Sequence, residues 1–270
     1  MSVAFEFTAS NGDAYETHMG RWSRRLAEVF LDFVGVADGE QVLDLGCGTG
    51  SLTYALAQRV QYQTIVGVDL SEAYIEHARE RTKTPQIEFR VGDATAIPLP
   101  DKSVDRVLSL LLMTFVADTQ AALREMRRVA RPGAVIAASV WDARGGHVTN
   151  RLFWDTAAVL DPKAGEARAA NYTRPMTRPG ELAAAWHTAG LENIEEGMLG
   201  TRMDFKSFDD FWAPNLGKQG PVADYLQTLD RDAFDSVFHH VREAYLGGEE
   251  DGPRSFAAMA WGVKGTVPTP

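Results

Sequence analysis

Three glycines at alternate positions, Gly46, Gly48 and Gly50, follow a short apolar run that contains an acid, Asp44. A helical pattern of apolar residues begins directly afterwards, so the spacing predicts a strand, a tight turn and a helix. Glycine reaches positive φ without a steric penalty and leaves the backbone open to a ligand. The unpaired N–H groups of the following helix add donors at the same place. This stretch therefore indicates a ligand-binding site.

The spacing of the glycines narrows the choice of ligand. The dinucleotide-binding pattern G-x-G-x-x-G would need its third glycine at position 51, where this chain has Ser51. Two further strand-like runs also end at acids, one at Asp69 and the other at Asp93. A carboxylate in the position of Asp69 can accept hydrogen bonds from both hydroxyls of a ribose. The pattern therefore departs from the dinucleotide fingerprint and still suits a nucleoside.

Four motifs in this order resemble the class I S-adenosylmethionine-dependent methyltransferases, and among them the type 11, ubiquinone/menaquinone-biosynthesis-like, small-molecule methyltransferases. The resemblance extends over about residues 15–141 and rests on Leu43–Gly50, Gly67–Ser71, Gly92–Ala94 and Arg131–Gly133. It implies S-adenosyl-L-methionine as cofactor and S-adenosyl-L-homocysteine as product. It also implies methyl transfer by in-line displacement to a small, apolar or aromatic molecule, at oxygen, nitrogen or carbon.

The resemblance also implies roles for individual residues. Asp44 would hold the ammonium group of the cofactor, Asp69 its ribose and Asp93 the adenine amino group. Leu70 and Ala94 would pack beside the adenine, and Tyr15 and Arg21 would cover the cofactor, with Arg21 near its carboxylate. The glycine turn would let the methionine part lie against the backbone, with Cys47 as a small packing residue. The complete predicted cofactor set is Tyr15, Arg21, Asp44, Gly46, Cys47, Gly48, Asp69, Leu70, Gly92, Asp93, Ala94 and Leu110.

The acceptor side offers fewer signals. Thr114 and Phe115 follow the predicted fourth strand, and Trp141 and Trp154 are candidates either for an aromatic pocket or for plain core. His147, in a Gly-Gly-His loop, is the best-placed candidate for a general base, and the alternative is a solvent-exposed loop histidine. A base is needed only if the acceptor must lose a proton. No carboxylate cluster can be assembled near this site, so we expect no metal.

Alternating strands and helices predict an α/β fold, with a doubly wound, mostly parallel, seven-stranded Rossmann-like sheet, helices on both faces and a small helical lid. We expect an N-terminal cover over residues 1–40, a cofactor-binding core over 41–141, a lid over 142–190, and a last part over 191–270 that completes the sheet. The lid would have helices near 149–160 and 179–189, joined by a polar segment with three prolines. The last two strands, near 191–204 and 254–264, would form an antiparallel hairpin around the helical residues 206–246. The core strands are expected at 41–45, 64–68, 86–91, 104–110 and 134–141, and its helices at 51–60, 72–82 and 119–130.

Composition excludes several classes of protein. A net charge of −10 argues against non-specific binding of nucleic acid. The single cysteine cannot form an intramolecular disulfide, which fits a cytoplasmic location. No apolar run is long enough to span a membrane, and the oligomeric state cannot be predicted. A nicotinamide-dependent oxidoreductase on a similar sheet and a non-catalytic cofactor-binding regulatory module remain the alternatives to a methyltransferase.

Overall fold

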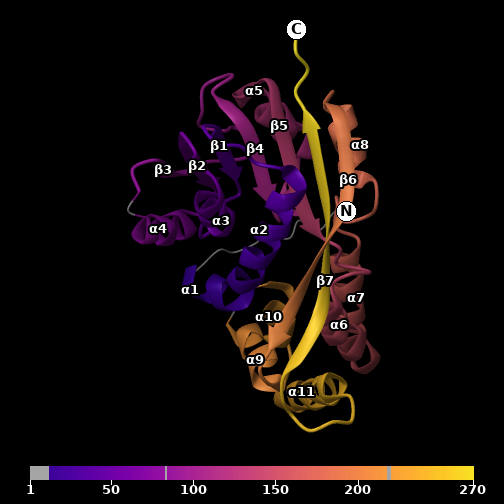
Figure 1. Ribbon diagram of the computed structural model, residues 1–270. Helices are drawn as coiled ribbons and strands as arrows, with labels where there is room; N and C mark the ends of the chain where they lie inside the picture. Colours follow the sequence, from indigo (N-terminus) through magenta and orange to yellow (C-terminus); the bar gives the residue numbers. More distant parts are fainter. Residues whose placement is uncertain (1–11, 83, 218–219) are drawn as a thin grey trace.

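The computed structural model describes residues 12–82, 84–217 and 220–270, so the first eleven residues of the predicted N-terminal cover lie outside it. Its centre is a seven-stranded sheet with the order β3-β2-β1-β4-β5-β7-β6 (Figure 1). The strands from β1 to β5 are parallel, and β7 runs antiparallel to both β5 and β6. The predicted sheet and its C-terminal hairpin are confirmed. The bounds are β1 (Gln41–Leu45), β2 (Thr64–Asp69), β3 (Ile87–Val91), β4 (Val104–Leu110), β5 (Ala130–Trp141), β6 (Glu192–Phe205) and β7 (Arg254–Thr266).

Helices cover both faces of the sheet, as a doubly wound fold requires. On one face, apolar side chains of α2 (Arg21–Val34), α3 (Ser51–Arg59) and α4 (Glu72–Arg81) form a core with the strands. On the other face, α5 (Thr119–Val129) and α8 (Glu181–Thr188) pack against β1, β4 and β5. Ser71 and Asp118 accept backbone N–H bonds at the starts of α4 and α5 and so cap both helices.

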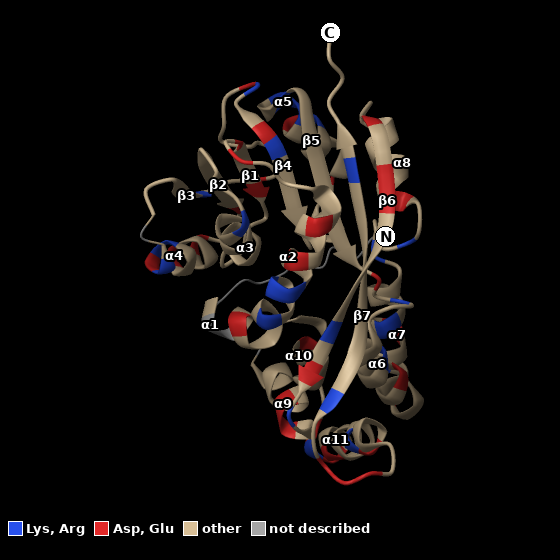
Figure 2. Ribbon diagram, in the orientation of Figure 1, with Lys and Arg blue, Asp and Glu red and all other residues tan. Residues whose placement is uncertain are grey.

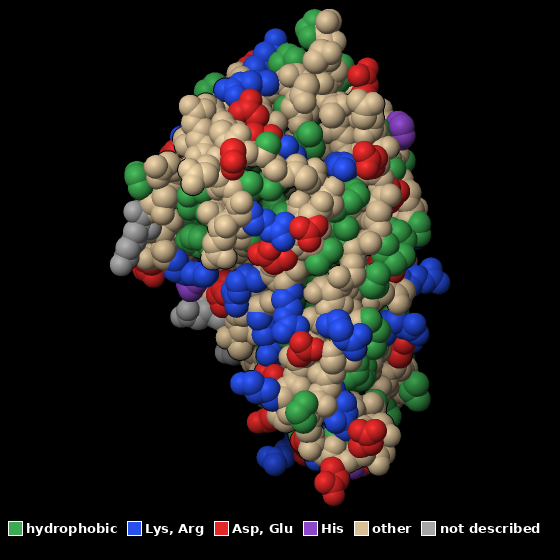
Figure 3. All heavy atoms as spheres, in the orientation of Figure 1, with side chains coloured by type: hydrophobic (Ala, Val, Ile, Leu, Met, Phe, Trp, Pro, Cys, Tyr) green, Lys and Arg blue, Asp and Glu red, His purple; other side chains and the backbone are tan. Residues whose placement is uncertain are grey.

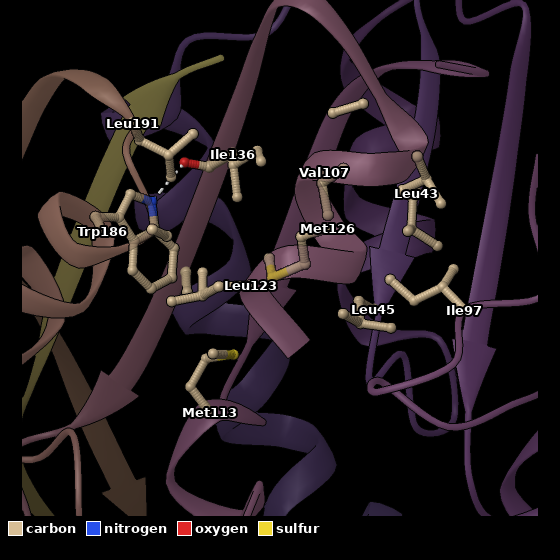
Figure 4. Packing of buried hydrophobic residues seen from close by; sticks show 14 of the residues in the cluster. Leu43, Leu45, Ile97, Val107, Met113, Leu123, Met126, Ile136, Trp186 and Leu191 are labelled. Carbon is tan, nitrogen blue, oxygen red and sulfur yellow. Dashed lines mark hydrogen bonds between the residues drawn. The ribbon is translucent and has the colours of Figure 1, made fainter. Parts of the chain in front are cut away.

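Trp186 fixes α8 to the sheet. Its side chain is fully buried, and its indole N–H donates to the backbone oxygen of Ile136 at 3.0 Å (Figure 4). Leu123 and Met126 of α5 belong to the same apolar cluster. α8 is thus a sheet-covering helix, although the prediction grouped its residues with the lid.

The polar segment predicted to join the two lid helices contains a helix, α7 (Pro162–Tyr172), so the prediction of a plain linker is wrong. Pro162 occupies the first turn, where a missing N–H costs nothing, and Asp161 caps it by accepting from the Lys163 N–H at 2.9 Å. The proline therefore begins a helix here. α6 (Val148–Leu160) precedes it and ends at the same aspartate.

A second, largely helical lobe lies below the sheet in Figure 1, where β6 and β7 extend past their neighbours. Its aromatic core joins α6 and α7 to α9 (Phe208–Trp212), α10 (Gly220–Leu226) and α11 (Arg231–Leu246). The 3-10 turn η3 (Ala213–Leu216) follows α9 and contacts α10. Stacked rings such as Phe208 and Trp212, whose centroids are 5.8 Å apart, fill it. The lobe is therefore built from two separate stretches of the chain.

The N-terminal elements lie at the waist between the lobes (Figure 1). They are α1 (Gly12–Tyr15), a π-helical turn η1 (Glu16–Gly20) and α2. Basic side chains gather around α2 in Figures 2 and 3, and two of its arginines pair with acids, Arg24 with Glu16 and Arg25 with Asp204. In the part of the chain that the structure describes, no helix is long and apolar enough to cross a membrane.

Candidate cofactor and acceptor site

The glycine turn follows β1 at the carboxyl end of the parallel strands. Gly46, Gly48 and Gly50 have φ angles of 75°, 53° and 91°, which explains the need for glycine at each. The Gly46 N–H donates to the oxygen of Val68 at 2.7 Å, so the turn is held against β2. A Cβ added at Gly48 would meet only the ring of Tyr15, at 3.9 Å. Among the three glycines of this turn, Gly48 is therefore the one whose backbone a ligand can approach most closely.

Asp69 ends β2 beside this turn. Its Oδ2 accepts the Gly48 N–H at 2.8 Å, and its Oδ1 accepts the Ser71 N–H at 2.9 Å. Burial raises the pKa of this carboxyl group. Since each carboxylate oxygen accepts two hydrogen bonds, both retain capacity for a ribose hydroxyl. The adjacent Leu70 is 73 % exposed, so its side chain is open to a planar ring.

Asp44 lies deeper, in β1, and is 1 % exposed. Its Oδ2 accepts the hydroxyl of Thr53 at 2.6 Å, whereas Oδ1 has no hydrogen-bond partner among the described residues. Burial raises the pKa of Asp44 to about 7, against the opposing bond from Thr53. A buried carboxylate oxygen without a donor is costly, so the site suits a cationic ligand group. Sequence reasoning missed Thr53, because no motif distinguishes it.

The third predicted acid stands at the edge of the site. Asp93 is exposed, and its Oδ1 accepts both the N–H and the hydroxyl of Thr95, at 2.7 and 2.8 Å. Gly92 donates its N–H to the backbone oxygen of Asp69 at 2.9 Å, which joins the ends of β2 and β3. Leu110 is buried at the end of β4. Binding roles for Asp93, Ala94 and Leu110 stay predictions.

The N-terminal segment covers the glycine turn. The ring of Tyr15 lies against Tyr74, with centroids 5.1 Å apart, and burial raises the pKa of its phenol to about 12. Glu16 accepts the hydroxyl of Thr49 at 2.5 Å and so ties η1 to the turn. Tyr15 therefore lies beside the glycine turn, and its contact with the cofactor stays a prediction. Cys47, inside the turn, is buried, and burial raises the pKa of its thiol.

Arg21 points toward the lower lobe. Its Nη1 donates to Oδ1 of Asp210 in α9 at 2.7 Å, and its Nη2 donates to the Asp210 backbone oxygen at 3.0 Å. The guanidinium also lies over the ring of Trp22, 4.3 Å from the centroid. Because Asp210 already balances this charge, the predicted contact between Arg21 and the cofactor carboxylate remains a prediction.

A cavity of about 250 Å³ opens between the lobes, next to Tyr15. It brings together all five predicted acceptor-side residues, which are Thr114, Phe115, Trp141, His147 and Trp154. Its lining also includes residues that sequence reasoning missed: His18, Asn171, Arg174, Phe211 and Asn215. These come from η1, α7, α9, η3 and the loop after α7, and sequence reasoning gave none of them a role at the site.

His147 caps α6 and lines this cavity, so it is not the solvent-exposed loop histidine that was the alternative. Its Nδ1 accepts the Asn150 N–H at 3.2 Å, and its ring meets Trp141 edge-on at 5.2 Å. Burial lowers its pKa to about 4. Because Nδ1 accepts a bond, the neutral ring carries its proton on Nε2. At neutral pH the remaining ring nitrogen is therefore a donor.

Within the described ranges, no group of three or more His, Cys, Asp or Glu side chains is placed to hold a metal ion. The predicted absence of a metal stays a prediction. The polar groups of the site are instead those of the glycine turn, of the buried Asp44 and the half-buried Asp69, and of the cavity between the lobes.

The strand order, the glycine turn and the acids at the strand ends together define a class I methyltransferase fold. The family model for the type 11 methyltransferase domain matches residues 43–138 of this chain.

Among curated relatives, a malonyl-[acyl-carrier protein] O-methyltransferase of Serratia marcescens is 35 % identical over 136 residues, which are 50 % of this chain and 50 % of that protein. A protein of Mycolicibacterium smegmatis, described as an S-adenosylmethionine-dependent methyltransferase, is 35 % identical over 184 residues, 64 % of this chain and 66 % of that one. The chain spans about half the length of the first curated relatives it matches.

Among solved structures, a phosphoethanolamine N-methyltransferase 2 of Haemonchus contortus, in complex with S-adenosyl-L-methionine, has the same fold. The TM-score is 0.59 and the identity 18 %, and the match covers 96 % of this chain and 57 % of that one.

Proposed function

We propose that this protein transfers a methyl group from S-adenosyl-L-methionine to a small, apolar or aromatic molecule. The observation that carries the proposal is the convergence of Gly48, Asp44 and Asp69 at one end of the sheet, beside a cavity of about 250 Å³. This arrangement separates a polar site for a nucleoside and an amino acid from a largely apolar site for an acceptor. The relatives named as methyltransferases support the same activity.

The residues of the first site fit the cofactor. Asp44 offers a buried oxygen without a partner to the ammonium group, and Asp69 offers both carboxylate oxygens to the ribose. Gly48 has no side chain to obstruct the methionine part, and the exposed Leu70 takes the adenine. When bound, the cofactor supplies a methyl group already activated by a positive sulfonium.

The chain's own residues then have to position the acceptor. Transfer needs the nucleophilic atom in line with the breaking carbon–sulfur bond, and holding two reactants in line supplies much of the rate enhancement. Trp141 and Trp154 form walls of the cavity, and Tyr15 stands between the cavity and the glycine turn. The same walls exclude water from the reacting atoms.

We assign His147 the role of a hydrogen-bond donor to the acceptor. The prediction of a general base at this residue is less well supported, because its pKa of about 4 makes the ring a poor base at neutral pH. Its Nδ1 is also occupied by the Asn150 N–H. Donation from Nε2 would orient an oxygen of the acceptor without changing its protonation.

The acceptor itself is proposed only as a class. The Serratia marcescens relative is named for methylation of malonyl-[acyl-carrier protein], and a Thermosynechococcus vestitus relative for methylation of 2-phytyl-1,4-naphthoquinone. Both names describe small organic groups, which agrees with a largely apolar cavity of about 250 Å³. No nucleic acid is proposed as a partner, because the net charge is −10.

Calorimetric titration with S-adenosyl-L-homocysteine, with NADH as the control, tests the proposal. Micromolar or tighter binding of S-adenosyl-L-homocysteine alone is expected. Tight binding of NADH without binding of S-adenosyl-L-homocysteine would contradict it and establish the oxidoreductase. Tight binding without transfer to any member of a broad acceptor panel would favour a regulatory module.

A further inference from the structure

Basic and acidic side chains are unequally represented in the described lining of the cavity between the lobes. Its described lining includes two arginines and two histidines but no aspartate or glutamate. One arginine, Arg21, is balanced from outside the lining by Asp210 at 2.7 Å. A ligand with a positive group would therefore find no carboxylate on the described part of these walls, whereas a ligand with a negative group would find cations and donors.

Arg174 is the second arginine, in the loop between α7 and α8. Its Cζ lies 5.1 Å from the ring centroid of Phe115, in the short turn η2 (Met113–Phe115) that follows β4. Ligands of parallel α/β sheets bind beyond these strand ends, so the guanidinium lies on the side of the cavity that faces the end of β4. Burial lowers the pKa of Arg174, although a guanidinium stays protonated at neutral pH. Its attraction for an anion is stronger here than in bulk water.

Further side chains of the lining carry donors that need an acceptor. The indole N–H groups of Trp141 and Trp154 and the hydroxyl of Thr114 are buried without a hydrogen-bond partner in the described parts of the chain. An indole N–H can only donate. Because burial lowers the pKa of both His18 and His147 to about 4, these rings are neutral and can also donate. Oxygen atoms of a ligand would satisfy such groups.

We infer that the acceptor is an apolar or aromatic carboxylic acid whose carboxylate binds the guanidinium of Arg174. Aromatic side chains such as Trp22, Phe153 and Phe211 line the rest of the cavity and suit the apolar body of such an acid. The inference rests on the proposed function, since it names the acceptor class for the same site. It also excludes amines with a positive charge as good ligands.

The test is calorimetry on the full chain saturated with S-adenosyl-L-homocysteine. The probes are three acids and their matching alcohols: benzoate and benzyl alcohol, phenylpropionate and phenylpropanol, decanoate and decanol. We expect at least one acid to bind about tenfold or more tightly than its alcohol, which is the effect of one charge-assisted pair. The Arg174→Gln variant should lose this preference, while its affinity for the alcohol and for S-adenosyl-L-homocysteine stays unchanged.

Two variants serve as controls. Arg174→Lys keeps the charge without the planar donor fork, so it should retain part of the preference. Arg178→Gln removes an exposed arginine from the same loop, one that pairs with Glu181 at 3.6 Å, and should change nothing.

If every acid binds no better than its alcohol, or if no acid binds, the inference is overturned. Survival of the preference in Arg174→Gln would equally overturn the assignment to Arg174. Binding of S-adenosyl-L-homocysteine is measured separately, so its absence would contradict the proposed methyl transfer and leave the acid preference to be measured on the free protein.

Discussion

The pH dependence of cofactor affinity follows from the burial of Asp44. In the free protein, burial raises the pKa of this carboxyl group to about 7. A cationic ammonium beside Oδ1 stabilises the ionised form, so binding at low pH must first release a proton. About one tenth of the groups are ionised at pH 6 and about nine tenths at pH 8. Affinity for S-adenosyl-L-homocysteine should therefore rise about tenfold from pH 6 to pH 8.

Calorimetry at several pH values, in buffers of different ionisation enthalpy, measures both the affinity and the released proton. The Asp44→Asn variant should bind weakly and lose this pH dependence. His18 and His147, with pKa values of about 4, are neutral throughout the range and do not contribute. Because burial also raises the pKa of Asp69, the variant separates the two acids. An affinity that does not change between pH 6 and 8, or an unchanged slope in Asp44→Asn, would refute the reasoning.

Three other predictions concern binding and stability. Asp69→Asn should weaken binding of S-adenosyl-L-homocysteine by about 1–3 kcal/mol in calorimetry, because charge-assisted bonds are lost. Glu72 is an exposed acid in the next helix, so Glu72→Gln should not weaken this binding. Equal losses of affinity in the two variants would mean that only net charge matters. Gly48→Ala and Gly247→Ala both place alanine at positive φ, 53° and 60°, and each should cost about 1 kcal/mol of stability. Only Gly48→Ala should also weaken binding of S-adenosyl-L-homocysteine. Unchanged binding in Gly48→Ala would mean that the ligand binds elsewhere. Trp186→Ala should lower the free energy of unfolding by about 3–5 kcal/mol in denaturant titration, and a loss below about 1 kcal/mol would show that α8 does not depend on this anchor.

The sequence was sufficient for the sheet and for the placement of the glycine turn beside Asp44 and Asp69. Apolar runs that end at Asp44 and Asp69, each followed by a turn and a helix, specify parallel strands by local pattern alone. The carboxyl ends of parallel strands meet at one edge, so the acids were expected beside each other before any tertiary contact was known. The structure places both beside the glycine turn.

Prediction from local sequence failed at a proline, because this residue is unfavourable inside a helix but well tolerated in its first turn. Pro162 was taken as part of a linker, but a proline in the first turn of a helix is well tolerated, and Asp161 supplies the cap. The grouping of α8 with the lid failed for a different reason. Only the packing of Trp186 against β5 shows which layer that helix joins.

What the sequence by itself determined is therefore the set of elements whose signals lie within one strand, turn and helix: the sheet, the glycine turn and the acids Asp44 and Asp69. The tertiary structure alone decided the cavity between the lobes. Its partners are far apart in the chain, as with Arg21 and Asp210, which are 189 residues apart, or Phe115 and Arg174 from separate loops. Such contacts exist because β6 and β7 extend beyond the sheet, and the second lobe at this end packs against the N-terminal helices. No periodicity within a segment encodes which distant segment it will meet, so this half of the site follows only from packing.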